Sequence, residues 1–541
     1  MLRRWSICLV FILATILSAC APAATPSGGE SAPATTGEAS SESAPVAGEP
    51  KAGGSLTYGQ LGDISTLDPF QLLAVSYAVH RNLYDSLIQY DNKLNIVPML
   101  AESWEANEEG TQITLNLRQG VKWHNGRDFV ADDVVQNFER AMSDTTGYNV
   151  YAMVNGVVES AEALDDHTVV VNFVAPTPQM FDILNAMHMH APESFSELDR
   201  NAIGTGPFKF QEWIPGDHIT LVRNDEYWQE GKPYLDQWTF KPYADYESLV
   251  AALQGGVIDV ASGIQAKDYE FLTGEGLNLV TGQEGFLLYT ITVNPPDPDQ
   301  EQGPLSDKRV RCAINYALDR ETVVEQALYG AGKRLVTNFP EWSVAYFPEF
   351  DDRYPFDLDM ARQLLAEAGY PDGGFTLRAI MPSSDPSYES VAVIHQADLA
   401  ELGIDMEIQV LDSTTYTAVR FGSEENGNSG DYDLDYTGVG RQHLDPTGLF
   451  SNSSYRTQNS PVFPHGDFPE GYVDLVTRAG QTTDVEERRE LYRQINEIQL
   501  EECINLPYSW RYIYFGTQTD VHGLAYDVED KVIFTDVWLD R

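Results

Sequence analysis

The sequence predicts an α/β fold, and three observations support that prediction. Residues 375–381 indicate a strand, residues 388–402 have the spacing of a helix that ends at Gly403, and residues 404–411 indicate a second strand. A strand, a crossover helix and a strand imply parallel pairing. Residues 55–541 are also rich in Tyr, Phe and Trp and are too many for a single core. We therefore expect two or three domains, built partly from parallel strands.

An earlier stretch predicts a smaller α+β unit. Residues 112–118 alternate polar and apolar side chains as a strand does, and Gln119-Gly120 and Asn125-Gly126 are typical turn pairs. Helical spacing follows over residues 131–142.

Residues 1–20, MLRRWSICLVFILATILSAC, indicate a lipoprotein signal peptide. Arg3 and Arg4 precede an apolar run that closes on a small-residue site before Cys20. The run is shorter than the roughly 20 residues of a membrane-spanning helix, so an uncleaved anchor is the weaker interpretation. We expect acyl chains on Cys20 to hold the protein at a membrane, in the periplasm or at the cell surface.

Residues 21–54 contain Ala, Pro, Ser, Thr, Gly and Glu and no aromatic residue. Such a composition cannot bury enough surface to fold, so we expect a disordered stalk.

The net charge of −48 argues against partners that are themselves anionic. Nucleic acid would be repelled by it, and so would anionic lipid headgroups, which leaves the lipid anchor as the expected membrane contact. Cys312 and Cys503 are the cysteines that remain in the body of the chain. They could form a disulfide in an oxidising compartment or stay free, and the sequence leaves both possibilities open.

The stretch DYDLDY, residues 431–436, places aspartates at alternate positions. A calcium loop needs glycine sixth and glutamate twelfth, where this chain has Tyr436 and Gln442. We therefore expect a strand with a solvated acidic side, and no calcium.

Other motifs argue weakly for chemistry. His188 and His190 would share one side of a strand, but no further ligand at metal spacing accompanies them. No phosphate loop, GxSxG elbow, SxxK or HExxH is present, although paired carboxylates for sugar hydrolysis stay open. We expect no enzyme, no catalytic residue, no cofactor and no metal. The many aromatic residues suit a cleft that binds a solute.

Five segments, in order along the chain, closely resemble the extracellular solute-binding proteins of family 5, the peptide, nickel and oligosaccharide receptors of ABC importers. They are LAESWEANEEGTQITLNLRQGVKWHNGRDFVADDVV, GTGPFKFQEWIPGDHITLVRNDEYW, LSDKRVRCAINYALDRETVV, DMARQLLAEAGYPDGGFTLR and DLAELGIDMEIQVLD.

This resemblance implies a bilobal periplasmic-binding-protein-like fold of type II with an additional α+β domain. By that analogy lobe I combines residues 55–88, 204–294 and 507–541. The inserted α+β domain would span residues 89–203, and lobe II residues 295–506.

The resemblance also gives an expectation for the loop after the DYDLDY strand. In peptide-binding members this loop often carries an aspartate that pairs with the α-ammonium group of the ligand. Its place here falls near Gln442, which carries no charge, although Asp445 could take the role after a small shift in alignment. The uncharged Gln442 keeps an oligosaccharide open as the ligand.

The expected ligand-binding positions match pocket-lining regions of the family, and for the aromatic ones core packing is about as good an explanation. They are Ser262, Gly263, Tyr289, Trp342, Gly440, Arg441, Gln442, His443, Tyr508 and Trp510.

The resemblance thus implies a monomeric, lipid-anchored receptor that traps a small solute, a peptide first and an oligosaccharide second, and passes it to the transmembrane subunits of an ABC permease. A secreted glycosidase is the third hypothesis.

Overall fold

The computed structural model describes the greater part of the chain beyond residue 48. The described residues are 49–71, 76–91, 94–143, 148–198, 200–281, 287–295, 303–421, 432–440, 444–446, 469, 471–512, 514–526 and 532–541. The signal peptide, Cys20 and most of the predicted stalk therefore lie outside them. Among these residues, no helix has both the length and the apolar character needed to cross a bilayer.

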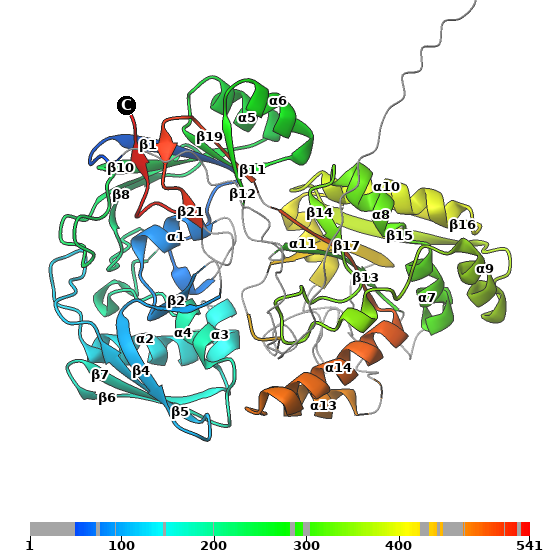
Figure 1. Cartoon of the computed structure of the whole chain (residues 1–541), viewed down its shortest axis with the longest axis horizontal. Helices are drawn as coiled ribbons and strands as arrows, with labels where there is room; N and C mark the ends of the chain where they lie inside the picture. The colour runs from blue at the N-terminus through cyan, green and yellow to red at the C-terminus, as the bar shows by residue number, and fades with distance from the viewer. Residues whose placement is uncertain are drawn as a thin grey trace, which may run out of the picture. The chain divides into compact units, whose positions relative to one another are not determined.

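A seven-stranded sheet is built from distant parts of the chain. Its order is β12 (Asn278–Thr281), β19 (Tyr514–Thr517), β11 (Val260–Ile264), β1 (Ser55–Leu61), β10 (Gln237–Tyr243), β9 (His218–Arg223) and β8 (Phe208–Ile214). Strand β1 runs parallel to β10 and β11, and the other pairs are antiparallel. Figure 1 shows α5 (Tyr246–Gln254) and α6 (Tyr269–Gly274) beside the β11 and β12 side of this sheet. The residue pattern alone did not predict that the chain returns here through β19.

A six-stranded sheet contains the predicted parallel unit. Its order is β14 (Gly332–Arg334), β18 (Asn505–Arg511), β13 (Leu287–Val293), β17 (Leu434–Gly440), β15 (Phe375–Pro382) and β16 (Ile404–Leu411). Strands β15 and β16 pair in parallel from Phe375 opposite Ile404, and α10 (Ser387–Ala400) connects them. The prediction of strand, helix and parallel strand is confirmed, and Figure 1 shows α10 beside this pair.

A four-stranded antiparallel sheet forms the smaller α+β unit. Its order is β4 (Ala101–Ala106), β5 (Gln112–Leu117), β7 (Thr168–Phe173) and β6 (Val158–Asp165). Helix α2 (Ala131–Ser143) follows β5, which confirms the predicted strand and helix. Trp123 is buried beside α2 and donates its Nε1 hydrogen to Asp133 at 2.9 Å.

The remaining elements are short. The other strands are β2 (Ile88–Tyr90), β3 (Ile96–Pro98), β20 (Val521–His522), β21 (Ala525–Tyr526), β22 (Val532–Ile533) and β23 (Trp538–Leu539). The other α-helices are α1 (Tyr77–Leu83), α3 (Tyr148–Val154), α4 (Met180–Ala186), α7 (Lys308–Tyr316), α8 (Arg320–Thr322), α9 (Leu358–Glu367), α11 (Ser413–Phe421), α13 (Tyr472–Ala479) and α14 (Val485–Glu502). Single turns of 3₁₀-helix are η1 (Pro69–Gln71), η4 (Pro192–Ser194), η5 (Ala266–Asp268), η6 (Pro304–Ser306) and η8 (Pro348–Phe350), and η7 (Val323–Ala327) is a π-helical turn.

Strand β17 is covered on both faces, so the expected solvated acidic side is wrong. Asp435 is 1% exposed, pairs with Arg420 of α11 at 2.9 Å and accepts the Tyr416 hydroxyl hydrogen at 2.7 Å. On the opposite face, the fully buried Tyr436 bonds through its hydroxyl to His395 of α10. The alternation of the strand is real, but both of its faces meet a helix.

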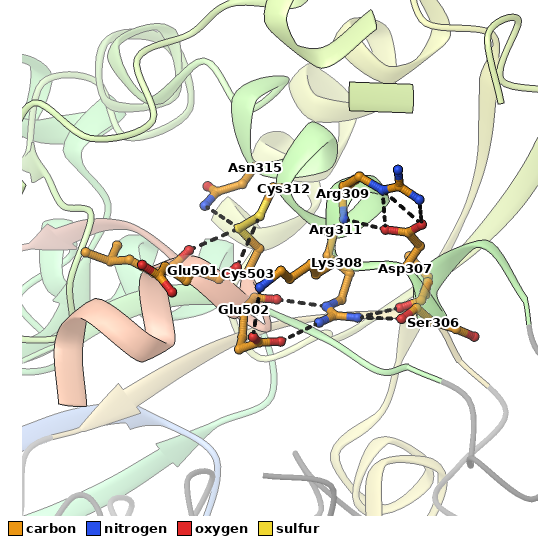
Figure 2. Close-up of polar contacts among 12 residues, drawn as sticks. Ser306, Asp307, Lys308, Arg309, Arg311, Cys312, Asn315, Glu501, Glu502 and Cys503 are labelled. Carbon is orange, nitrogen blue, oxygen red and sulfur yellow. Dashed lines mark hydrogen bonds and ion pairs between the residues drawn. A yellow bond between two sulfur atoms is a disulfide. The ribbon is translucent and has the colours of Figure 1, made fainter. Parts of the chain in front are cut away.

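Cys312 and Cys503 form a disulfide, which decides the alternative that the sequence left open. The bond joins α7 to the end of α14, and Figure 2 shows the polar contacts around it. Arg311 donates to the Glu502 carbonyl oxygen at 2.8 Å and to its carboxylate at 3.0 Å, and also to the Leu305 carbonyl oxygen at 2.9 Å. Covalent and polar contacts therefore fasten the same two helices together.

Candidate functional site

A cavity of about 140 Å³ lies among segments that flank the two large sheets. One wall follows the end of β11 and continues through η5 to the start of α6. The other wall comes from the end of η7 and from the turn that opens α10, and one residue comes from the connection between β18 and β19. The lining residues are Ile264, Gln265, Ala266, Lys267, Tyr269, Ala327, Leu328, Tyr329, Ala331, Asp385, Pro386, Ser387, Ser390 and Tyr512.

Asp385 is the carboxylate of this cavity, and its own turn and a neighbouring strand hold it. Its Oδ1 accepts from the Ser387 amide at 2.9 Å and from the Ser387 hydroxyl at 2.7 Å, so the turn that opens α10 fixes the side chain. The Tyr289 hydroxyl donates to its Oδ2. The turn follows the carboxyl end of β15, a parallel strand, where ligands of open α/β sheets usually bind.

The opposite wall supplies a cation and an aromatic ring. Lys267 lies in η5 with its Nζ 5.3 Å from the centre of the Tyr246 ring. The Tyr269 ring packs on Tyr514 at 3.9 Å between centroids. The cavity therefore offers a positive charge, a negative charge, hydroxyl groups and flat rings, which together suit a polar solute with charged ends.

Tyr512 joins the two sheets at the cavity. It lies between the end of β18 and the start of β19, so the chain leaves the six-stranded sheet and enters the seven-stranded sheet at this point. Its ring lies 5.0 Å from Trp510 and 5.9 Å from Tyr514. A change in the angle between the sheets would move these rings against one another.

The structure brings some of the predicted ligand residues close to this cavity. Ser262 and Gly263 lie on β11 just before the lining residue Ile264, and Gly263 has a φ of +76° with open space around it. Tyr289 reaches Asp385 through its hydroxyl and stacks on Tyr508, with centroids 5.8 Å apart. Both rings are fully buried, and neither is among the residues that line the cavity.

Other predicted residues are not among those that line the cavity, or they lie outside the described part. Trp510 is buried against Leu288 and Leu335, and Trp342 is half-buried in the loop before η8. Gly440 ends β17, opposite Leu287 of β13. Arg441, Gln442 and His443 lie outside the described residues. Ligand contact by any of the ten residues stays a prediction.

The comparison with known families decides what kind of protein carries this cavity. The family described as bacterial extracellular solute-binding proteins, family 5 Middle, matches residues 95–461, which is more than half of the chain. The chain belongs to this family. It is therefore an extracytoplasmic solute-binding protein of the ABC-importer class.

Individual relatives of this family 5 protein cover most of its length. Oligopeptide-binding protein AppA of Bacillus subtilis (strain 168) is 30% identical over 446 residues, which are 75% of this chain and 75% of AppA. Glutathione-binding protein GsiB of Salmonella typhi is 28% identical over 461 residues, 82% of this chain and 86% of GsiB. The solved structure of the periplasmic binding protein DppA from Helicobacter pylori, in complex with peptide STSA, has a TM-score of 0.77 at 26% identity and covers 91% of this chain and 99% of that one. This likeness confirms the bilobal α/β fold of type II periplasmic binding proteins.

Several lining residues of this family 5 protein were not among the predicted ones. Lys267 lies four residues after Gly263, and Tyr512 lies two residues after Trp510, so the predicted segments were close but stopped short. Asp385 and Ser387 lay outside every predicted segment. The position of Asp385 after a parallel strand was the signal that could have found it.

The two histidines of the rejected metal site are buried in the hydrophobic interior. His190 lies 2.6 Å from a guanidinium nitrogen of Arg140, and its ring meets Phe70 edge-on. Burial, with the nearby Arg140 charge, lowers the pKa of His190 to about 3. Within the described ranges, no group of three or more His, Cys, Asp or Glu side chains could hold a metal ion.

Proposed function

We propose that this family 5 protein captures a peptide between its two lobes and delivers it to the transmembrane subunits of an ABC permease. The observation that carries the proposal is the cavity, because Asp385 and Lys267 offer opposite charges on different walls. A zwitterionic peptide presents an ammonium group at one end and a carboxylate at the other, so it can pair with both. The names of AppA and of the DppA complex support the same ligand class.

The sheet memberships support a division into two lobes and an inserted domain. The seven-stranded sheet would form lobe I, the six-stranded sheet lobe II, and the four-stranded sheet the inserted domain. Strands β13 and β18 pair within the six-stranded sheet, so we place the crossings between lobes before β13 and after β18. These positions move β13, and residues 507–511 of β18, from the lobe I of the family analogy to lobe II.

Binding would work by closure of the lobes around the solute. A solute that contacts both walls only in the closed form has a higher affinity for that form and shifts the population towards it. No bond of the solute needs to change, so we propose binding without catalysis. Linear, complete release of product from a chromogenic glycoside by the pure protein would contradict this.

The anchor belongs to the same proposal. A lipidated Cys20 would keep the receptor near its permease, and the stalk of residues 21–54 would let it reach the transporter. Incorporation of radiolabelled palmitate into the wild-type chain, and its loss in Cys20→Ala, would support this. We expect a single peak at the monomer mass in light scattering.

An oligosaccharide is the second candidate, and the cavity also gives it some support. Tyr269, Tyr329 and Tyr512 line the cavity, and tyrosine rings stack on sugar rings as well as on peptide side chains.

Calorimetric titration separates the two ligand classes. The protein is first unfolded and refolded to release any cargo, then titrated with a mixed pool of di- to pentapeptides and with a panel of sugars. Binding heat from the peptide pool and none from the sugars supports the proposal. The absence of binding heat from every peptide contradicts it.

Lys267→Met tests the cavity itself. Loss of one charged hydrogen bond should weaken peptide binding by about 10- to 150-fold, since such bonds contribute roughly 1.5–3 kcal/mol. Lys122→Met is the matched control, because Lys122 is far from the cavity in sequence and its partner is the exposed Glu226. Equal affinities for the two variants would remove the cavity as the ligand site.

A further inference from the structure

We propose that Asp182 is a positioning residue that fastens Asp445, five residues after the end of β17, to the α+β unit, and that this contact stabilises the solute-bound form of the protein. The inference rests on the proposed function, because it assigns a role in solute retention to a contact made outside the cavity.

The contact joins helix α4 and strand β2 of the α+β unit to Asp445, which follows β17, through a single carboxylate. Asp182 lies in α4, beside the four-stranded sheet, and its side chain is buried. Its Oδ1 accepts the Tyr90 hydroxyl hydrogen at 2.9 Å, and its Oδ2 accepts the Asp445 amide hydrogen at 2.9 Å. Asp445 follows β17 of the six-stranded sheet by five residues. One side chain therefore connects the α+β unit to lobe II.

Helix α14 contacts the other partner, Asp445, through two side chains. The Asp445 carboxylate accepts the Tyr492 hydroxyl hydrogen at 3.1 Å and pairs with Arg488 at 3.1 Å. Both members of the ion pair are largely buried. Asp445 thus contacts α14 through its side chain and Asp182 through its backbone amide. A shift of α4 would therefore shift Asp445 as well.

A second close approach lies between the same two regions. Gly110, in the turn between β4 and β5, comes so near the segment before α14 that an added Cβ would lie 2.8 Å from the Thr483 methyl carbon. Gly110 also has a φ of +69°, which favours glycine. The α+β unit therefore meets lobe II at two separate places.

The charges around Asp182 make its contribution depend on pH. The groups that face it are Tyr90 of β2, the amides of Leu444 and Asp445, and the Asp445 carboxylate, with Arg488 and Tyr492 behind. Helix α3, which also packs on α4, has no charged residue. Burial and then the Asp445 charge raise the pKa of Asp182 to about 7.

A solvated aspartate has a pKa of about 3.9, well below that of Asp182 in this contact. If the contact opens and Asp182 meets water, its pKa falls, so making the contact takes up a proton. The proton uptake then stabilises the contact fully below about pH 4. This stabilisation falls as pH rises to about 7, and it does not change further above that pH. Dissociation of the solute should therefore speed up between about pH 5 and 7.

The experiment measures koff of the peptide pool at several pH values. The wild-type protein should release peptide faster as pH rises from 5.5 to 7.5, and Asp182→Asn, which cannot titrate, should flatten this profile. Asp182→Ala, which removes both acceptor atoms, should raise koff about tenfold at pH 5.5. Tyr90→Phe removes one contact and should lie between. Glu139→Gln, an exposed change on α2 of the same unit, is the control and should follow the wild type.

A merely structural role for Asp182 predicts a different result. The ligand-free variants would then melt at lower temperature while koff and its pH profile stay unchanged, and that outcome overturns the inference. If the wild type binds no peptide, the proposed function fails, and small-angle scattering of the ligand-free protein decides this contact alone. The role of the contact is supported if the radius of gyration of the wild type is smaller at pH 5.5 than at pH 7.5, while that of Asp182→Asn is the same at both pH values. It is overturned if neither protein changes its radius of gyration with pH.

Discussion

Strands β5 and β17 both alternate polar and apolar residues, yet water reaches the polar side of β5 alone. In β5, Gln112 and Asn116 are exposed while Ile113, Leu115 and Leu117 are buried. In β17, Leu434 and Tyr436 are buried on one side, and Asp435 and Thr437 are buried on the other. The same pattern in the sequence therefore gives one half-exposed strand and one strand that is buried on both sides.

The difference lies in what covers each sheet. Helix α2 packs against the sheet that contains β5, and the Gln112 and Asn116 side of this strand stays in water. Strand β17 lies between β13 and β15, with α10 on one face and α11 on the other. A polar residue on β17 must therefore find a partner inside the protein, and Asp435 finds Arg420 and Tyr416.

The largest expected effect comes from breaking that partnership. Asp435→Ala leaves the Arg420 charge buried without its carboxylate, and such changes cost about 3–5 kcal/mol of unfolding free energy. Urea denaturation with the disulfide intact measures this loss. The double variant Asp435→Leu/Arg420→Met should recover most of it, because apolar side chains can replace a buried ion pair. A single variant as stable as the wild type would show that the Asp435 side of β17 is solvated after all.

The Cys312–Cys503 disulfide lies in the same lobe as β17 and should contribute to the stability of that lobe. Cys312→Ser/Cys503→Ser should lower the unfolding free energy by about 3 kcal/mol, since the unfolded chain regains the freedom of a long loop. Reduction of the wild-type protein should give the same loss in the same urea titration. Reductant should leave the double variant unchanged, and a response there would point to another source of the effect.

The buried histidine behind β17 should make stability depend on pH. Burial lowers the pKa of His395 to about 4, from 6.5 for a free histidine. Its unfolded form therefore takes up a proton below about pH 6.5 while the folded form does not, so stability falls as pH drops from there towards 4. His395→Gln should remove about 2 kcal/mol of this acid loss between pH 6.5 and 4.5, given that one pKa unit is about 1.4 kcal/mol.

The control for that measurement is a histidine with the opposite shift. A hydrogen bond that the half-buried His218 donates from Nδ1 to the Asp217 carboxylate raises the pKa of His218. The stabilisation that His218 gives to the folded state is present in acid and lost as pH rises. His218→Gln should therefore change the pH dependence of the unfolding free energy weakly, in the direction opposite to His395→Gln.

The smallest effect belongs to the wet side of β5. Asn116→Ala removes a side chain that is exposed and bonds to Ser103 at 3.0 Å. Surface changes of this kind stay within about 0.5 kcal/mol. A loss as large as that of Asp435→Ala, in the same titration, would erase the distinction between the two strands.

Local patterns in the sequence were sufficient to predict individual helices and strands. They were insufficient to predict which distant segments pack against them. The spacing that predicted α10 between two strands depends on residues that are neighbours along the chain. The burial of Asp435 depends on α11, which comes from a segment that no local period connects to β17. The return of β19 to the sheet of β1 is of the same kind, because their partners lie hundreds of residues apart in the chain.

The site shows the same limit. Family resemblance placed Ser262, Gly263 and Trp510 within a few residues of the cavity lining, because the segments that form its walls share the family pattern. Asp385 was missed because a lone aspartate in an acidic chain carries little information, and its value appears when the Ser387 and Tyr289 contacts are known. The family resemblance also predicts Tyr289 and Tyr508 as pocket residues, and in the structure both are fully buried and are not among the residues that line the cavity.

The row of rings that runs from Trp510 through Tyr512 to Tyr514 gives the protein a built-in optical reporter. An indole 5.0 Å from a tyrosine ring changes its emission when that ring turns or when water reaches it. The difference in fluorescence between the wild type and Trp510→Phe would therefore follow motion of the connection between the sheets in real time. No dye would need to be attached, and the same signal could screen candidate cargoes at low protein concentration.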